Sequence, residues 1–523
     1  MLCRFVAVTL TLAWSIVAGS SAYAGQEAPP QERQAHTAPT PRKPLEGLDG
    51  YIEEGMKRWD IPGLAIAVVK DDRVVYAKGF GVRELGKPEK VTERTLFAMA
   101  SQSKAFTATA LGILVSEGKL RWDDPATKYL PWFQMYDPYV TKELTVRDLL
   151  CHRCGLATWQ GDLMWYGSDL NRRDVLERVR FLKPEFSFRS RYGYCNLTFV
   201  AAGEIIPAVT GVTWEEFVER RFFEPMGMSR TTTDIGEMER RDDVARPHTL
   251  VKGKIVPIAY RSTRNTAPAG AINSCVKDWA QWIRLQLNQG TLDGRKIVPS
   301  EIIRETRTPQ TLMPARPEGD KIPFSAYGLG WSLRDYEGRL VIAHGGGLDG
   351  MLSLSVFVPQ EKLGVVVLTN YDEQEFYTVL PLHVIDAYLN VTRKDREEKL
   401  LKAHKERERR AHDDEEKEKP KGGSRPSLEL SGYAGVYHHP ALGKATLSTK
   451  DGKLSIEIER NPGLRGELKH WQFDTFRVEW DDPYLRSSLI PFRLNEHGKV
   501  DEFRMKVRPD FVDPMEYRLS RMP

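Results

Sequence analysis

Apolar runs of strand length lie near both ends of residues 45–392, and helical patterns fill the stretch between them. Leu64–Val69 and Arg73–Ala77, separated by two aspartates, predict a β-hairpin. Further strands are predicted at 331–334, 339–343, 352–357 and 364–368. Helices are predicted at 105–117, 146–150, 172–180, 197–210, 214–221, 277–289, 299–306 and 380–389. This order predicts an α+β domain, an antiparallel sheet assembled from both chain ends with helices on its faces.

The pattern changes after residue 427 to short alternating strands. Leu454, Ile456 and Ile458 share one face of such a strand, so residues 428–523 predict a small all-β domain, a lipocalin-like barrel or sandwich. Residues 393–427 between the two domains carry many charges of both signs. A solvated helix is one interpretation of this segment, and a charged linker without a binding partner is the one we favour.

The N-terminus is typical of a secretory signal peptide, residues 1–24. Arg4 precedes an apolar stretch, Phe5–Val17, and Ala22-Tyr-Ala24 offers a small-residue cleavage site. The apolar stretch is shorter than the roughly 20 residues of a membrane span, although an uncleaved anchor is the alternative. Residues 25–44 are rich in Pro, Gln, Ala and Thr and predict a disordered leader. We therefore expect a periplasmic or secreted protein without a transmembrane segment after cleavage.

Charge and cysteine content narrow the classes of partner. A net charge of +4 over 523 residues, with both signs mixed, gives no reason to expect nucleic acid. Cleavage of the signal peptide would leave Cys151, Cys154, Cys195 and Cys275, whose pairing the sequence does not assign. The C-x-x-C at 151–154 has no second pair and no histidines at zinc spacing, so we expect buried thiols and no metal or other cofactor.

Three motifs could carry chemistry. The first, Ser101-Gln-Ser-Lys104, precedes the helix predicted at 105–117. A serine and a lysine three residues apart at a helix start share one face, where the serine N–H can donate to an oxyanion. A lysine kept neutral by burial can accept the serine proton. Taken alone, this motif is weak, and the start of a surface helix is the better interpretation of it.

The second motif is Tyr194-Cys-Asn196, and the third is His344-Gly-Gly-Gly347. A tyrosine hydroxyl can relay a proton once a cation lowers its pKa, and an asparagine can hold a substrate amide. Glycines allow close approach to backbone N–H groups, and a histidine can supply a donor or a cation. A core tyrosine with a capping asparagine, and a glycine turn, are the plain structural interpretations. A lipase-type loop is disfavoured because the chain has no G-x-S-x-G sequence.

The order of these motifs resembles the penicillin-recognising serine hydrolases, which include class C β-lactamases, D-Ala-D-Ala carboxypeptidases, D-aminopeptidases and related esterases. The flanking sequences at 96–101, 149–156, 268–274 and 327–331 are similar to those of the family. The resemblance covers about residues 45–390 and implies a β-lactamase/transpeptidase-like fold. It implies Ser101 as the acylated nucleophile, Lys104 as its activator and Tyr194 as the proton shuttle. By the same resemblance, Asn196, His344, Gly346 and Gly347 would bind substrate, and the N–H groups of Ser101 and Gly347 would form the oxyanion hole.

The sequence departs from the family pattern in two places, of which the second bears on the substrate. Cys151 and Cys154 replace hydroxyl residues in a loop that is structural in the family. The third motif is H-G-G where β-lactamases have K-T-G, whose Lys and Thr bind the β-lactam carboxylate. We therefore expect a serine hydrolase acting on esters or on peptides that contain D-amino acids. A β-lactamase or penicillin-binding D,D-carboxypeptidase is the alternative, and a non-catalytic binding module is a further one. The role of residues 428–523 stays open between a lid, an oligomerisation surface and a stabilising domain.

Overall fold

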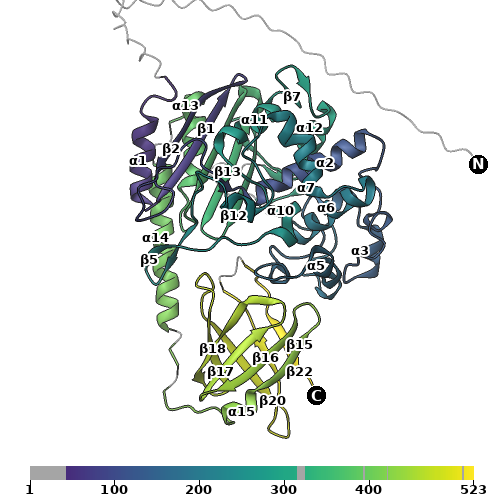
Figure 1. The fold of residues 1–523 in the computed structure, drawn as a ribbon, viewed down its shortest axis with the longest axis vertical. Coiled ribbons are helices and arrows are strands. Elements are labelled where there is room, and N and C mark those ends of the chain that lie inside the picture. Colours follow the sequence, from purple (N-terminus) through teal and green to yellow (C-terminus); the bar gives the residue numbers. More distant parts are fainter. Residues whose placement is uncertain (1–42, 315–323, 393–394, 418, 421, 509–511) are drawn as a thin grey trace, which may run out of the picture. The chain divides into compact units, whose positions relative to one another are not determined.

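The computed structural model describes residues 43–314, 324–392, 395–417, 419–420, 422–508 and 512–523 (Figure 1). The predicted signal peptide and nearly all of the predicted leader lie outside the described residues. Residues Pro44–Pro523 form one compact unit, which contains both the sheet domain and the C-terminal β domain.

An eight-stranded antiparallel sheet forms the centre of the larger domain, in the order β2-β1-β14-β13-β12-β11-β10-β9. Its strands are β1 (Gly63–Lys70), β2 (Arg73–Gly81), β9 (Thr311–Leu312), β10 (Ser325–Tyr327), β11 (Ser332–Tyr336), β12 (Arg339–Leu348), β13 (Met351–Val358) and β14 (Leu363–Thr369). The N-terminal hairpin joins the late strands through β1 and β14, with Ile66 opposite Val367. The prediction of an antiparallel sheet built from both chain ends is confirmed.

Helices cover both faces of this sheet (Figure 1). The helices of the domain are α1 (Leu48–Arg58), α2 (Ser103–Ser116), α3 (Pro138–Glu143), α4 (Val146–Leu149), α5 (Arg172–Arg178), α6 (Asn196–Thr210), α7 (Trp214–Val218), α8 (Glu224–Met226), α9 (Ile235–Glu239), α10 (Ala267–Gly270), α11 (Val276–Leu287), α12 (Ser300–Thr306) and α13 (Phe376–Leu389). Three short strand pairs lie outside the sheet: β3 (Phe97–Ala98) with β6 (Asn273–Ser274), which are distant in the chain, and the hairpins β4 (His248–Val251) with β5 (Lys254–Pro257) and β7 (Thr291–Leu292) with β8 (Arg295–Lys296).

Alternating side chains of β1 enter two separate apolar cores. Leu64, Ile66 and Val68 pack with α1 and α13, whereas Ala65 and Ala67 pack with α2, α6 and α11. Successive side chains of a strand point to opposite faces, so a strand buried on both sides is apolar throughout. The continuous apolar run in the sequence therefore reflects a central strand covered by helices on both faces.

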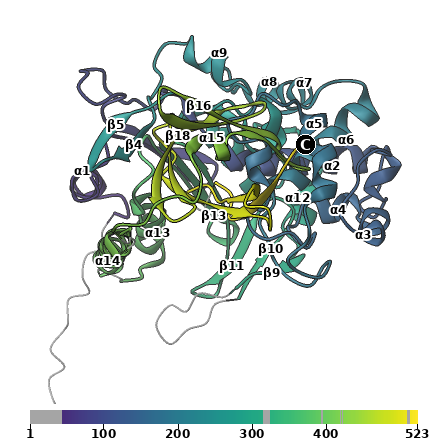
Figure 2. The ribbon, with the colours of Figure 1, turned by 90° about the horizontal axis from the view of Figure 1, so that it is seen from below.

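The C-terminal domain is a closed eight-stranded antiparallel barrel (Figures 1 and 2). After α15 (Leu430–Tyr433) its strands are β15 (Gly435–His439), β16 (Gly443–Lys450), β17 (Lys453–Ile458), β18 (Asn461–Gln472), β19 (Thr475–Trp480), β20 (Ser488–Leu494), β21 (Val500–Met505) and β22 (Tyr517–Arg521). The pair β15–β22 closes the barrel. Leu454, Ile456 and Ile458 are all buried in its interior, as their alternation predicts.

The charged segment between the domains differs from the expected linker. It contains a helix, α14 (Arg396–Lys417), and this helix has binding partners. Arg396 Nη1 donates to Asp386 Oδ2 of α13 at 2.7 Å, and Arg58 Nη2 of α1 donates to Glu397 Oε2 at 2.6 Å. The sequence shows the charges at helical spacing but not their partners, a donor on α1 and an acceptor on α13, that anchor the helix.

Within the described residues, no single helix is long and apolar enough to cross a membrane. One bent pair, Asn196–Thr210 with Trp214–Met226, passes the same test of length and composition.

Candidate active site

Ser101 lies in a tight turn that leads into the buried helix α2. A 3₁₀ turn, Ala100–Gln102, comes first, and α2 begins at Ser103, two residues before the predicted start. Ala100 has a φ of +47°, a left-handed conformation that is unusual for a residue with a Cβ. Ser103 stabilises this turn by donating from Oγ to the Ala100 carbonyl at 2.7 Å and accepting from Ile272 N at 3.0 Å. The turn therefore presents Ser101 at the edge of a rigid core.

Lys104 lies fully buried beneath the nucleophile. Its Nζ is 3.0 Å from Ser101 Oγ and donates to the Ala269 carbonyl at 2.8 Å. Burial lowers the pKa of Lys104 to about 7, and the charges of Asp162 and Cys195 raise it only in part. No described carboxylate forms an ion pair with this amine. A substantial fraction is neutral near pH 7, and neutral amine can accept the Ser101 proton.

Tyr194 packs against the same amine, with Lys104 Nζ 4.8 Å from the centre of its ring. Burial raises the pKa of Tyr194 well above its usual value, although its hydrogen bond with the Ser101 side chain acts in the opposite direction. The expected lowering of the Tyr194 pKa by a nearby cation does not occur, because burial raises this pKa instead. The phenol therefore keeps its proton at neutral pH and is suited to relay protons, while Lys104 is the better base.

Asn196 is the first residue of α6, and its amide is tied to a residue that the motifs do not include. Asn196 Nδ2 donates to Asp162 Oδ2 at 2.6 Å. Both side chains are buried, with exposed fractions of 8% and 2% respectively. Burial raises the pKa of Asp162 well above its usual range. The pair leaves the Asn196 carbonyl oxygen as the group able to meet a substrate N–H.

His344 lies on β12, but its ring does not supply a cation. Gly345 O can only accept, so His344 Nδ1 carries a proton and donates to it at 2.6 Å. The Tyr327 hydroxyl then donates to His344 Nε2 at 2.9 Å. Burial and the charge of Lys104 lower the pKa of His344 to about 3. The expectation of a donor or a cation at this position needs correction, because both ring nitrogens are occupied and the ring is neutral.

The glycines after His344 bring β12 against the nucleophile turn. A Cβ on Gly346 would lie 2.0 Å from the Met99 carbonyl oxygen, which no side chain could tolerate. Pairing between β11 and β12 ends at Ala343 opposite Ser332, so residues 344–347 have a strand partner only on the β13 side. Backbone groups of this segment are therefore available beside Ser101.

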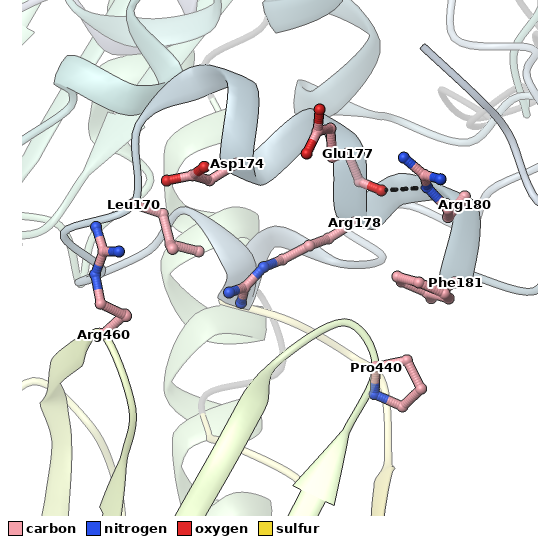
Figure 3. Close-up of a pocket in the computed structure, with 8 residues that line it drawn as sticks. All are labelled: Leu170, Asp174, Glu177, Arg178, Arg180, Phe181, Pro440 and Arg460. Atoms are coloured by element: carbon pink, nitrogen blue, oxygen red, sulfur yellow. Dashed lines mark hydrogen bonds between the residues drawn. The ribbon is translucent and has the colours of Figure 1, made fainter. Parts of the chain in front are cut away.

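A pocket of about 570 Å³ unites the predicted residues. Its lining contains Ser101, Tyr194, Asn196, His344, Gly346 and Gly347, together with Trp159, Trp165, Tyr166, Tyr192, Tyr327 and Tyr377. Lys104 does not line the pocket itself, but its Nζ is hydrogen-bonded to the lining residue Ser101. Two lining residues, Tyr484 and Val512, come from the C-terminal barrel. A second cavity of about 420 Å³, lined by α5 residues and by Pro440 and Arg460, contains none of the predicted residues (Figure 3).

The charged residues that line the active-site pocket are acidic. Among its described lining residues there is no lysine or arginine. Three of its carboxylates are paired: Asp349 with Arg261, Glu373 with Arg486 and Glu375 with Arg407. Asp372 has no ion-pair partner in the described part of the chain, and burial raises its pKa to about 6. Asp372 Oδ2 accepts from the backbone N–H of Gly350 at 2.8 Å. The pocket thus contains a carboxylate without an ion-pair partner and, among its described lining residues, no fixed cation.

The four described cysteines are buried free thiols. Burial raises the pKa of Cys151 to about 12, so this thiol is inert at neutral pH. In the loop that contains Cys151 and Cys154, His152 accepts at Nδ1 from the backbone N–H of Cys195 at 3.0 Å. This contact joins the loop to the Tyr194-Cys-Asn196 motif, which gives the loop a structural role.

Comparisons with known proteins agree with this architecture. Residues 48–389 match the family model described as Beta-lactamase, and residues 419–518 match a domain of unknown function, DUF3471. Unguisins hydrolase ungD of Aspergillus violaceofuscus is 28% identical over 452 residues, which cover 79% of this chain and 78% of that protein. Protein flp of Staphylococcus aureus is 24% identical over 365 residues, 69% of each chain.

A solved structure, the octameric penicillin-binding protein homologue from Pyrococcus abyssi, superimposes with a TM-score of 0.59 at 23% identity. The match covers 91% of this chain and 99% of that one, and at this identity it supports the fold alone. The family model spans more than half of the chain and includes all three motifs. The chain is a serine hydrolase that belongs to the beta-lactamase family of penicillin-recognising enzymes.

Proposed function

We propose that this protein is an exported hydrolase that forms an acyl-enzyme on Ser101, with esters or D-amino-acid peptides as substrates. The observation that carries the proposal is the buried amine of Lys104, 3.0 Å from Ser101 Oγ, with a pKa near neutrality. Among the described residues, the charge of Lys104 forms no ion pair that would explain it as a structural residue. A general base, in contrast, needs a pKa near neutrality. Export is proposed from the signal-peptide pattern of residues 1–24.

The reaction would proceed in two steps. Neutral Lys104 accepts the Ser101 hydroxyl proton as Oγ attacks the substrate carbonyl carbon, and the backbone N–H groups of Ser101 and Gly347 stabilise the oxyanion. The tetrahedral intermediate collapses, and the leaving group takes a proton relayed by Tyr194 from the lysine. Water then attacks the acyl-enzyme with the same groups acting in reverse, which releases the acid and restores Ser101.

Two features of the pocket support the proposed substrate class over a β-lactam. The carboxylate of a β-lactam would find no lysine or arginine among the described lining residues, and His344 is neutral. Asp372 instead offers a negative charge without an ion-pair partner. A neutral ester, or a D-aminoacyl group with a protonated amine, is compatible with this lining.

A labelling experiment tests the proposed chemistry. A fluorophosphonate probe should phosphonylate Ser101 of the full-length protein, with loss of fluoride, as read by peptide mass spectrometry, and Ser101→Ala should abolish labelling. Ser116→Ala is the matched control, since Ser116 lies at the far end of the same helix and donates only to the Ile113 carbonyl. Turnover of p-nitrophenyl acetate and D-alanine p-nitroanilide, with nitrocefin slower or inert, is the expected pattern. Labelling at another serine, or none in folded protein, contradicts the proposal and favours a binding module.

A further inference from the structure

One short turn of the hydrolase domain, residues 161–166, connects the active-site pocket to the C-terminal barrel. Its 3₁₀ helix, Asp162–Met164, carries the carboxylate that holds Asn196. Asp162, Trp165 and Tyr166 all line the pocket. The position of this turn therefore sets both the orientation of the Asn196 amide and the shape of one pocket wall.

A barrel carboxylate binds the backbone of this turn. The N–H of Leu163 donates to Asp513 Oδ2 at 3.0 Å. The Asp513 carboxylate is itself fixed, because Tyr517 Oη donates to Oδ2 at 2.5 Å and Met515 N donates to Oδ1 at 2.9 Å. Asp513 is fully buried, so water does not compete for these bonds.

A second barrel side chain binds the carbonyls of the same turn. Asn461, the first residue of β18, donates from Nδ2 to the carbonyl oxygen of Tyr166 at 2.8 Å and to that of Leu163 at 3.4 Å. Asn461 is also buried. The barrel thus supplies an acceptor for one N–H of the turn and a donor for two of its carbonyl groups.

A charged network fixes the adjoining wall. Arg261 donates to Asp349 of the hydrolase domain and, through Nη2, to Asp482 of the barrel at 2.5 Å. The same guanidinium is 3.1 Å from the Tyr166 hydroxyl. Tyr484, two residues after Asp482, lines the pocket itself. The barrel therefore contacts the wall on both sides of the turn.

We infer that the barrel is an integral part of the active site and that Asp513 is a positioning residue for substrate binding, acting through the 161–166 turn and Asp162 on the Asn196 amide. This inference rests on the proposed acyl-enzyme function of Ser101. Two further contacts of the barrel, Arg178 with the Ala441 and Leu442 carbonyls and Arg460 with the Asp169 carbonyl, hold the barrel without touching the turn, and both arginines line the second cavity (Figure 3).

The test is a comparison of Asp513→Asn with a matched control in the full-length enzyme. The asparagine cannot accept all three hydrogen bonds, because one of its two terminal atoms is a donor. We expect the KM for D-alanine p-nitroanilide to rise about tenfold, with kcat changed less, because this substrate has the N–H groups that the Asn196 carbonyl oxygen can meet. Asp474→Asn is the control, since Asp474 accepts from Tyr433 and Ser427 away from the turn. It should lower the melting temperature without changing KM.

A double-mutant cycle separates positioning from general destabilisation. In an Asn196→Ala background, Asp513→Asn should change KM less than about twofold, because the group it positions is gone. An equal rise in both backgrounds, or an unchanged KM in the single variant, overturns the inference. Asn461→Ala gives the same test if Asp513→Asn does not fold. Fluorophosphonate labelling of Ser101 should stay within about twofold in every variant, so loss of labelling in the wild-type enzyme would mark failure of the proposed function instead.

Discussion

The pH dependence of the reaction should follow the titration of Lys104. With a pKa of about 7, about half of the amine is neutral at pH 7, whereas a lysine with the ordinary value of 10.5 would be neutral in roughly one molecule in 3,000. The base is the neutral form, so activity rises with pH. We expect kcat/KM for p-nitrophenyl acetate to rise about tenfold between pH 6 and pH 8 and then to level off.

Substitution of Lys104 should separate activity from stability. Lys104→Arg keeps a cation that does not deprotonate and should lower kcat/KM by about 10²–10⁴-fold. The unfolded state binds the lysine proton more tightly between pH 7 and 10.5, so stability rises with pH in that window. At pH 7 the buried amine costs about 4 kcal/mol. Lys104→Met should therefore stabilise the fold by about 3 kcal/mol, after about 1 kcal/mol for the lost bond to the Ala269 carbonyl.

The assays are a pH–rate profile and urea unfolding of the full-length protein at pH 7. Lys128→Arg is the control, since Lys128 is exposed and pairs only with Asp124 on the surface. A flat pH–rate profile between pH 6 and pH 8 would refute the role of Lys104 as base. A kcat/KM of Lys104→Arg within tenfold of the wild-type value would refute it too. A Lys104→Met variant no more stable than the wild type would show that the amine is not desolvated as the structure indicates.

Three further substitutions test the walls of the site. Gly346→Ala should lower kcat at least tenfold and reduce the melting temperature, because its Cβ would lie 2.0 Å from the Met99 carbonyl oxygen. Tyr327→Phe leaves His344 Nε2 buried without a donor and should destabilise the fold by about 1–3 kcal/mol in urea unfolding; no loss would contradict the assigned tautomer. Asp372→Asn should raise KM for D-alanine p-nitroanilide about three- to tenfold and leave that for p-nitrophenyl acetate unchanged. In the wild type, the KM for D-alanine p-nitroanilide should rise as the pH falls through about 6, where Asp372 becomes protonated.

The parts of the fold and site that depend on local sequence could be predicted. Strand runs such as Leu64–Val69, and the alternation of Leu454, Ile456 and Ile458, specify buried faces directly. Ser101 and Lys104 lie three residues apart, so one helical turn places them together. The grouping of these two residues with Tyr194 and His344 in one pocket followed from the family resemblance, since no local rule relates positions so distant in the chain.

The sequence did not show which residues set the protonation and orientation of the active-site groups. Asp162 holds Asn196 from 34 positions away, Tyr327 fixes the tautomer of His344, and Asp513 reaches Leu163 from another domain. None of them belongs to one of the three motifs, although Tyr327 lies in the flanking segment 327–331, because a hydrogen bond between positions distant in the chain leaves no periodic trace in the sequence. The same reason explains the error about His344: a histidine suggests a cation, but burial beside Lys104 makes the charged ring unfavourable. A motif identifies the reacting groups, while their protonation and orientation are properties of tertiary burial. The barrel, which contains no catalytic motif, nonetheless lines the active-site pocket through Tyr484 and Val512 and binds the 161–166 turn through Asp513.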